Sequence, residues 1–325
     1  MADTQILNTP AWREFPRTLL RGMGQVMFQD SWLTGLLFLA GIFVGAYTEG
    51  PGFGIVAWGA LVGVATSTLT GYLLRLQDEN GSQGLWGFNG ALVGCAFPTF
   101  MGHTVWMWIC LILCAAMSTW VRSGLDNIMR PWKVSSLTFP FVLSTWFFLL
   151  ASRLFHGIPP EWMSTPEFAT GMQGSYDLSF GNLVVCWLKG ISQVFLINSW
   201  ITGIIFLVAL AVSNWRASLW AAIASAVALL VAIVWEGPAH DINDGLYGFS
   251  AVLTGIALGS TFCDSGNWKT WLWTLTGIVI TVFVQAAMNA FFSPMGLPTL
   301  TGPFCVATWI FLLPAYKMFA TRQQS

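Results

Sequence analysis

The sequence predicts an all-α integral membrane protein of ten transmembrane helices and two re-entrant half-helices, arranged as two inverted repeats. Three observations predict this fold: an apolar composition, apolar runs about as long as a bilayer is thick, and sequence blocks that recur in both halves. Of the 325 residues, 55% are hydrophobic and 8% are charged, whereas roughly 25% of a soluble domain is charged. Lipid is therefore the expected solvent for most of this chain.

Ten apolar runs, bounded by charged residues, Gly and Pro, have the length of transmembrane helices. Five lie in each half of the chain, at 31–47, 52–74, 84–101, 104–121 and 137–155, then at 199–214, 217–235, 245–262, 269–290 and 300–319. A shorter run precedes each set, at 18–28 and 187–197. At about 1.5 Å per residue it crosses only half of the ~30 Å hydrocarbon layer. Each short run is expected to be a re-entrant half-helix, the alternative being a helix lying flat at the interface.

Three sequence blocks recur in the same order about 165 residues apart. RGMGQVMFQDSWLTGLLFL, from Arg21, aligns without gaps with KGISQVFLINSWITGIIFL, from Lys189; GLWGFNGALVGCA aligns with GLYGFSAVLTGIA, and LTFPFVLSTWFFLL with LTGPFCVATWIFLL. Because each unit has an odd number of crossings, the second must run through the membrane in the opposite sense. Residues 1–155 and 187–325 are therefore expected to be inverted repeats, joined by an extracytoplasmic connector at 156–186.

The basic residues predict the orientation. With a cytoplasmic N-terminus, eleven of the thirteen Lys and Arg residues fall in inside loops, Arg122 among them, and only Arg153 and Lys189 lie outside. Acidic residues gather in the outside loops: Glu49, Glu161, Glu167, Asp177, Glu236, Asp241 and Asp244. The expected location is the plasma membrane, in bacteria the inner membrane, with both termini cytoplasmic.

Several function classes are excluded by composition and spacing. The formal net charge of −1 leaves no basic surface for nucleic acid. The six cysteines show no Cys-x-x-Cys or Cys/His ligand spacing, so neither a disulfide framework nor a zinc site is expected. No cofactor is predicted. His240, Asp241 and Asp244 could imitate a metal site but are expected to be turn residues. Because the membrane core offers almost no acid, base or nucleophile, no catalytic residue is predicted and the chain is not expected to be an enzyme.

The scarcity of intramembrane charge also limits the solute. Ion-coupled carriers usually place ionisable side chains inside the bilayer. Asp30 is the nearest such residue here, and its counterpart in the second half is the neutral Asn198. We therefore expect a neutral solute.

Neutral polar side chains at matched positions are the candidate lining of a solute path. They are Gln25 with Gln193 and Thr138 with Thr301. Each Thr belongs to a Leu-Thr-x-Pro-Phe block, in which the proline is expected to free an upstream carbonyl. The alternative is a threonine hydroxyl bonded back to its own helix.

Apolar side chains accompany these polar groups and also recur in both halves. The pairs are Val26 with Val194, Phe88 with Phe249, and Leu92 with Leu253. They are either ordinary core packing or the walls of slots that admit only a planar solute.

With these residues the sequence resembles the urea transporter family. The resemblance rests on the Gly-x-x-Gln-Val blocks, on GLWGFN and GLYGFS, and on LPTLTGPF at 297–304, and it spans nearly the whole chain. The first copy of the last block reads VSSLTFPF and lacks Leu-Pro. The resemblance implies a urea transporter-like fold and passive, channel-like transport of urea by a homotrimer in the membrane lipid, with one pore between the two halves of each protomer.

The resemblance also implies roles for the candidate residues. Gln25 and Gln193 would lie at the ends of a selectivity filter, and Thr138 and Thr301 near its middle. The slots would be shaped by Val26, Phe88, Leu92, Val194, Phe249 and Leu253. Two alternatives stay open: a channel for short amides or ammonia, although the paired intramembrane histidines expected for ammonia are missing, and, less favoured, an integral-membrane enzyme.

Overall fold

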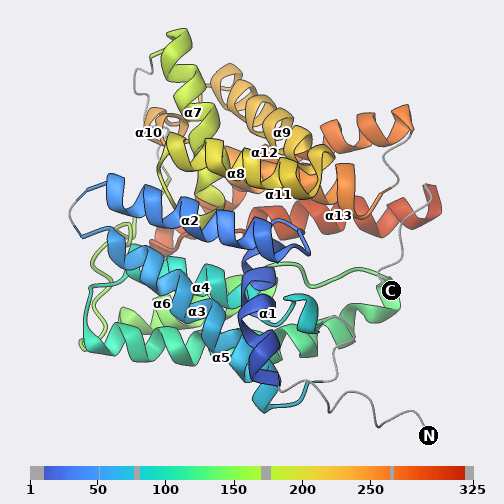
Figure 1. Cartoon of the computed structure of the whole chain (residues 1–325). Helices are drawn as coiled ribbons and strands as arrows, with labels where there is room; N and C mark the ends of the chain where they lie inside the picture. The colour runs from blue at the N-terminus through green and yellow to red at the C-terminus, as the bar shows by residue number, and fades with distance from the viewer. Residues whose placement is uncertain (1–10, 51, 77–80, 170–176, 264–266, 319–325) are drawn as a thin grey trace, which may run out of the picture.

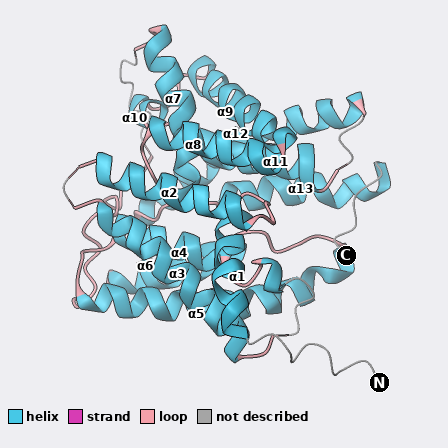
Figure 2. Cartoon of the chain, viewed as in Figure 1, coloured by secondary structure: helices cyan, strands magenta, loops and turns pink. Residues whose placement is uncertain are grey.

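The computed structural model describes residues 11–50, 52–76, 81–169, 177–263 and 267–318. In these ranges the regular elements are all helices and no strand occurs (Figure 2). The chain is therefore an all-α protein over its described length.

The first half of the chain forms the lower part of the molecule in Figure 1, and the second half the upper part. The helices of the first half are α1 (Ala11–Gln25), α2 (Trp32–Thr48), α3 (Gly54–Leu73), α4 (Phe88–Phe100), α5 (Val105–Met129) and α6 (Phe139–Ser152), with short 3₁₀ turns η1 (Gly81–Gln83) and η2 (Arg130–Trp132). The second half has α7 (Phe180–Ser192), η3 (Gln193–Phe195), α8 (Trp200–Ser213), α9 (Trp215–Val234), α10 (Ala239–Asn243), α11 (Gly248–Ile256), the π turn η4 (Ala257–Thr261), α12 (Trp268–Phe292), η5 (Ser293–Met295) and α13 (Gly302–Met318).

Polar side chains cap the helices where the apolar runs begin. Ser31 accepts a hydrogen bond from the Thr34 N–H at the start of α2, and Ser199 accepts one from the Thr202 N–H at the start of α8. Such caps satisfy backbone donors that have no partner inside the helix. Thr104 begins α5 in the same way. The caps explain why these helices start where the hydropathy pattern predicts.

Four helices of the described chain are long and apolar enough to cross a bilayer. They are Gly54–Leu73, Val105–Trp132, Trp215–Val234 and Trp268–Met295. A fifth span results if Phe180–Phe195 and Trp200–Ser213, which meet at a 71° bend, form one broken unit. Shorter apolar helices are Trp32–Thr48, Phe88–Phe100, Phe139–Ser152, Gly248–Thr261 and Gly302–Ala315. These helices are those of a membrane protein with several apolar spans.

Three helices extend beyond the apolar runs that predict them. The half-helix expected at 18–28 begins at Ala11, and the one expected at 187–197 begins at Phe180, inside the range expected as connector. Both have a polar side that a search for apolar runs does not detect. Helix α5 continues to Met129, well past residue 121.

The expectation that Arg122 lies in an inside loop is wrong. It lies within α5, is buried, and its Nη2 is 3.1 Å from Oδ2 of Asp126, one turn further along the helix. A buried cation requires such a partner, because removing it from water is otherwise costly.

Left-handed backbone recurs at matched positions of the two halves, either inside the aligned sequence blocks or at the same distance before them. Non-glycine residues rarely adopt positive φ, so its recurrence marks a specific local geometry. The matched residues, with φ in degrees, are Phe28 (63) and Leu196 (59), Arg75 (50) and Glu236 (52), Gly84 (99) and Gly245 (68), Lys133 (56) and Gly296 (57), and Leu137 (53) and Leu300 (52).

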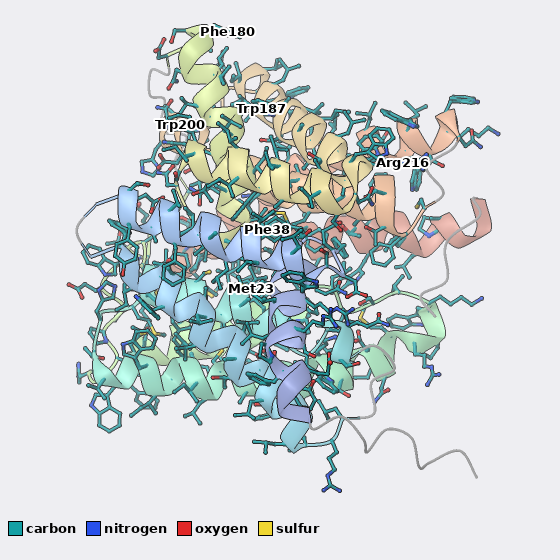
Figure 3. All side chains as sticks on the ribbon, in the orientation of Figure 1. Met23, Phe38, Phe180, Trp187, Trp200 and Arg216 are labelled. Carbon is teal, nitrogen blue, oxygen red and sulfur yellow. The ribbon has the colours of Figure 1, made fainter. Side chains whose placement is uncertain are left out.

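Helices α2 and α8 lie side by side where the two parts of the molecule meet (Figures 1 and 3). The rings of Phe38 and Phe206 pack edge to face, with their centroids 5.0 Å apart. Thr34 donates a hydrogen bond to the Ala209 carbonyl at 3.2 Å, and Thr202 donates one to the Gly41 carbonyl at 2.9 Å. Because Thr34 aligns with Thr202, and Gly41 with Ala209, the two hydrogen bonds are reciprocal.

Candidate functional site

The two predicted threonines, one from each half of the chain, are in contact with each other. Thr138 Oγ1 and Thr301 Oγ1 are 2.6 Å apart, and both residues are buried. Cys305 Sγ lies 3.3 Å from Thr138 Oγ1. Each hydroxyl thus finds its partner in the other half of the chain, and the alternative in which it bonds back to its own helix does not describe this geometry.

The local backbone aims both threonines inward. Leu137 and Leu300, directly before them, adopt left-handed φ, and α6 and α13 begin directly after them. Pro140 therefore lies in the first turn of its helix, where a missing N–H costs nothing. The expectation that this proline frees an upstream carbonyl is wrong, because the Ser136 carbonyl, four residues before Pro140, accepts a hydrogen bond from the Phe139 N–H at 3.1 Å.

Two tryptophans hold the loops that carry the threonines, and each reaches across to the other half. Trp146 Nε1 donates to the Pro298 carbonyl at 2.8 Å, in the loop before Thr301. Trp309 Nε1 donates to the Ser135 carbonyl at 2.9 Å, in the loop before Thr138. The sequence reasoning missed both tryptophans, although each follows its threonine by eight residues in the two aligned blocks.

The preceding long helices also hold these loops. Asp126 Oδ1, on α5, accepts a hydrogen bond from the Ser136 N–H at 2.8 Å. Asn289 Oδ1, on α12, accepts one from Thr299 Oγ1 at 2.9 Å. Asn89 Oδ1 accepts one from the Phe141 N–H at 3.1 Å, in the first turn of α6. The loops are therefore fixed by specific side chains, as a preorganised site requires.

Gln25 lies at the end of α1, in what we call the first end cluster: Arg21, Gln25, Asp30 and Gln83. Gln25 Nε2 donates to the Gln83 carbonyl at 3.1 Å, and Arg21 Nε is 3.1 Å from Asp30 Oδ1. Helix α1 packs against α4. This contact brings the cluster towards the predicted wall residues of the first half, which are all buried: Val26, Phe88 and Leu92.

Gln193 lies in η3, in the second end cluster: Lys189, Gln193, Asn198 and Asp244. Gln193 Nε2 donates to the Asp244 carbonyl at 3.0 Å, and Lys189 Nζ is 3.5 Å from Asp244 Oδ1. Turn η3 packs against α11. The predicted wall residues of the second half are likewise buried: Val194, Phe249 and Leu253.

Glu49, just after α2, adds an ionisable carboxyl to the surroundings of the second end cluster. Burial raises the pKa of Glu49 to about 7, although the Asn198 N–H and the nearby Lys189 oppose the rise. Asp244 adds a repulsive contribution. His240 Nε2 lies 3.4 Å from Asp244 Oδ2. Charged groups thus gather at this end, whereas the threonine pair has neutral partners.

The structure brings Thr138 and Thr301 into contact, and the other eight predicted residues lie on or directly after elements that pack in pairs, α1 with α4 and η3 with α11. Helix α4 packs against α6, and α11 against α13, which connects the wall residues to the threonines. Apolar helices that enclose neutral hydrogen-bonding side chains, with charged groups near the helix ends, define a membrane transport protein for a neutral solute.

The chain belongs to the urea transporter family, whose sequence model matches residues 16–316. It is 31% identical over 315 residues to urea transporter 1 of sheep (Ovis aries), covering 95% of this chain and 79% of that protein. It is 30% identical over 310 residues to urea transporter 1 of rat (Rattus norvegicus), covering 94% and 78%. The resemblance read from the motifs is confirmed, and the family consists of transporters rather than enzymes.

Proposed function

We propose that this protein mediates passive, channel-like transport of urea, along a path between the two halves of each protomer. Membership of the urea transporter family supports the solute. The observation that carries the proposed path is the buried contact between Thr138 and Thr301, one from each half, at 2.6 Å.

The chemistry of urea suits this pair. Urea is planar and neutral, with four amide hydrogens and one carbonyl, and a hydroxyl can both donate and accept a hydrogen bond. At 2.6 Å the two threonine oxygens leave no space between them. For a urea molecule to pass, the two hydroxyls must separate, and its amide and carbonyl groups then replace the hydroxyl–hydroxyl bond. No buried polar group is then left unpaired, which keeps the barrier low.

The same site disfavours ions. Helices α6 and α13 both begin beside the threonines, and a helix N-terminus carries a partial positive charge that opposes a cation. An ion of either sign also loses its hydration in a narrow path, where the threonine pair offers no charged side chain to replace the lost water.

The remaining predicted residues shape the ends of the path. Gln25 and Gln193 supply the terminal hydrogen-bonding groups. Apolar slots that admit a flat solute are formed by Val26, Phe88 and Leu92 on one side and by Val194, Phe249 and Leu253 on the other. Apolar walls offer nothing to a hydrated or bulky solute, so selection is by shape and by the loss of water.

We assign the chain ten crossings in two inverted repeats, 1–155 and 187–325, joined by an extracytoplasmic connector at 156–186 whose last residues, from Phe180, already belong to α7. The matched left-handed residues and the reciprocal bonds of Thr34 and Thr202 support this assignment. We also place both termini in the cytoplasm and the protein in the plasma membrane, which in bacteria is the inner membrane.

We further assign the protein to a homotrimer embedded in lipid. Large apolar side chains on the outside of the single chain, such as Phe180 (83% exposed) and Leu73 (71% exposed), need such a cover. Native mass spectrometry in a mild detergent tests the trimer.

Stopped-flow urea uptake into proteoliposomes tests the function, with protein-free liposomes as the control. Rapid saturable uptake, unchanged by a protonophore or by removal of sodium, is expected. Uptake that requires either gradient contradicts a passive path. Thiourea, acetamide and ammonia as competing solutes separate urea from the other neutral solutes, and ammonia release from urea by the purified protein would reveal an enzyme.

A further inference from the structure

We propose that the ion pair Arg21–Asp30 positions Gln25 and that the ion pair Lys189–Asp244 positions Gln193. The two halves differ in where the acidic residue lies: Asp30 follows the half-helix, whereas Asp244 lies in a loop. The proposal rests on the proposed function, because it takes the two glutamines to contact the solute. Arg21, Asp30, Lys189 and Asp244 are positioning residues, which act through the glutamines.

The aligned blocks place the two end clusters in register. Arg21 aligns with Lys189 and Gln25 with Gln193, so each glutamine follows a basic residue by one helical turn. Asp30 aligns with Asn198, five residues after each glutamine.

The two loop residues complete the register. Gln83 and Asp244 both directly precede the glycine of a Gly-Leu-aromatic-Gly-Phe block. In the first half the acidic residue, Asp30, follows the half-helix and the amide residue, Gln83, lies in the loop. In the other half the two are exchanged.

In the first end cluster the ion pair joins the half-helix to the segment that leaves it. Arg21 Nε and Asp30 Oδ1 are 3.1 Å apart, on either side of Gln25 in sequence. Gln25 Nε2 reaches the Gln83 carbonyl at 3.1 Å. Gly84, with φ 99°, packs so closely on the main chain of Arg21 that no Cβ would fit. The accepting carbonyl is therefore fixed against the half-helix that carries Arg21.

In the second end cluster one acid makes both connections. Asp244 Oδ1 lies 3.5 Å from Lys189 Nζ and accepts a hydrogen bond from Asn198 Nδ2 at 3.0 Å. The main-chain carbonyl of the same residue accepts the bond from Gln193. Gly245, with φ 68°, leaves no space for a Cβ against Lys189 and its neighbours. In both halves, therefore, the same three parts meet around one glutamine. They are a basic residue, the segment that follows the half-helix, and the loop before the Gly-Leu-aromatic-Gly-Phe block.

A positioning role follows from the energetics of these groups. All four charged side chains are partly exposed, between 20% and 41%, and such pairs contribute little to stability. A glutamine side chain with several free torsions loses entropy when it is held in place. A fixed carbonyl acceptor reduces the number of orientations available before the solute arrives. The ion pairs therefore act mainly on where the glutamine amide lies.

Exchanging the two patterns tests the proposal. In the second half the variants are Asp244→Gln, Asn198→Asp and the double variant Asn198→Asp/Asp244→Gln, which adopts the pattern of the first half at unchanged net charge. Asp241→Asn removes a nearby acid whose one ion-pair contact in the described structure is with His240 at 3.7 Å, so it serves as the matched control.

The reciprocal set is made in the first half. Asp30→Asn and Gln83→Asp are the single variants, and Asp30→Asn/Gln83→Asp adopts the pattern of the second half. This set decides the question if a second-half variant fails to fold, which size-exclusion chromatography and circular dichroism will show.

Urea uptake by proteoliposomes gives the half-saturating concentration and the maximal flux per inserted protein. Asp244→Gln is expected to raise the half-saturating concentration about fivefold, because a Gln193 that is no longer held in place loses about one hydrogen bond to the solute. The maximal flux should change less. The exchange variants should return to within about twofold of the wild type, and Asp241→Asn should match it.

Two outcomes overturn the proposal: exchange variants as defective as the single ones, or single variants that match the wild type. Both leave the proposed function standing. Wild-type protein that carries no urea overturns the proposed function and this inference together.

Discussion

The contact between Thr138 and Thr301 allows a quantitative test of the path. Thr138→Val replaces a hydroxyl by a methyl group at nearly constant volume. The Thr301 hydroxyl, 3% exposed, then loses its partner at 2.6 Å. An unpaired buried hydroxyl costs about 1–3 kcal/mol. Thr301→Val leaves Thr138 with only the weak contact to Cys305 Sγ at 3.3 Å. We expect each single variant to unfold more easily by this amount.

The effect on transport follows from the same hydroxyls. On the proposed path, each substitution removes one group that would replace the water around urea. Loss of one hydrogen bond worth about 1–2 kcal/mol in the barrier lowers the flux by roughly five- to thirtyfold. The double variant Thr138→Val/Thr301→Val leaves no hydroxyl unpaired. Its stability loss should therefore be smaller than the sum of the two single losses by about 1 kcal/mol, while its flux falls further.

Thermal unfolding in detergent and stopped-flow uptake measure these quantities for the four forms. Thr274→Val is the matched control, because Thr274 is equally buried but donates to the Thr270 carbonyl of its own helix at 2.8 Å. Its flux should equal that of the wild type. The reasoning is refuted if both single variants carry urea at the wild-type rate, or if the stability losses are strictly additive.

Three further predictions concern stability. In the folded state the pKa of Glu49 is raised to about 7, so the protonated carboxyl stabilises the fold. This contribution is complete below about pH 4.5 and is lost as the pH rises through 7. Glu49→Gln should reduce the loss of stability between pH 5 and pH 8 in thermal melts, and an unchanged loss contradicts the prediction. Lys133→Gly should stabilise by about 1 kcal/mol, because this exposed residue has φ 56°; a lower melting temperature counts against this explanation. Gly63→Ala should destabilise by about 1–3 kcal/mol, since its Cβ would meet the Gly90 carbonyl, whereas Gly124→Ala, with open space around it, should not; equal melting temperatures would show that α3 and α4 can move apart.

Much of the fold follows from hydropathy, because a chain in lipid must satisfy its backbone groups within helices. The pattern locates α2 and α3 to within a few residues. It misses the starts of α1 and α7, whose polar sides interrupt the apolar run. It also places Arg122 in a loop, since hydropathy alone does not reveal that Asp126 pairs with it inside the helix.

The candidate site was found by repetition rather than by composition. Thr138 and Thr301 stand out because the same residue precedes a proline in both halves, and the structure brings them together. Trp146 and Trp309 recur just as regularly, but an indole in an apolar helix gives no sign that its N–H reaches a loop of the other half. Such partners depend on the tertiary arrangement of the two halves, which local pattern does not determine.

The reciprocal hydrogen bonds of Thr34 and Thr202 give α2 and α8 the form of an isologous interface, as in a homodimer with two-fold symmetry. In a true homodimer every substitution would appear at both ends of the path at once, so neither end could change alone. Fusion of the two halves into one chain removes that restriction. The acid at position 30 in one half and at position 244 in the other is such a difference, and on the proposed path it would present two unlike ends to the two compartments.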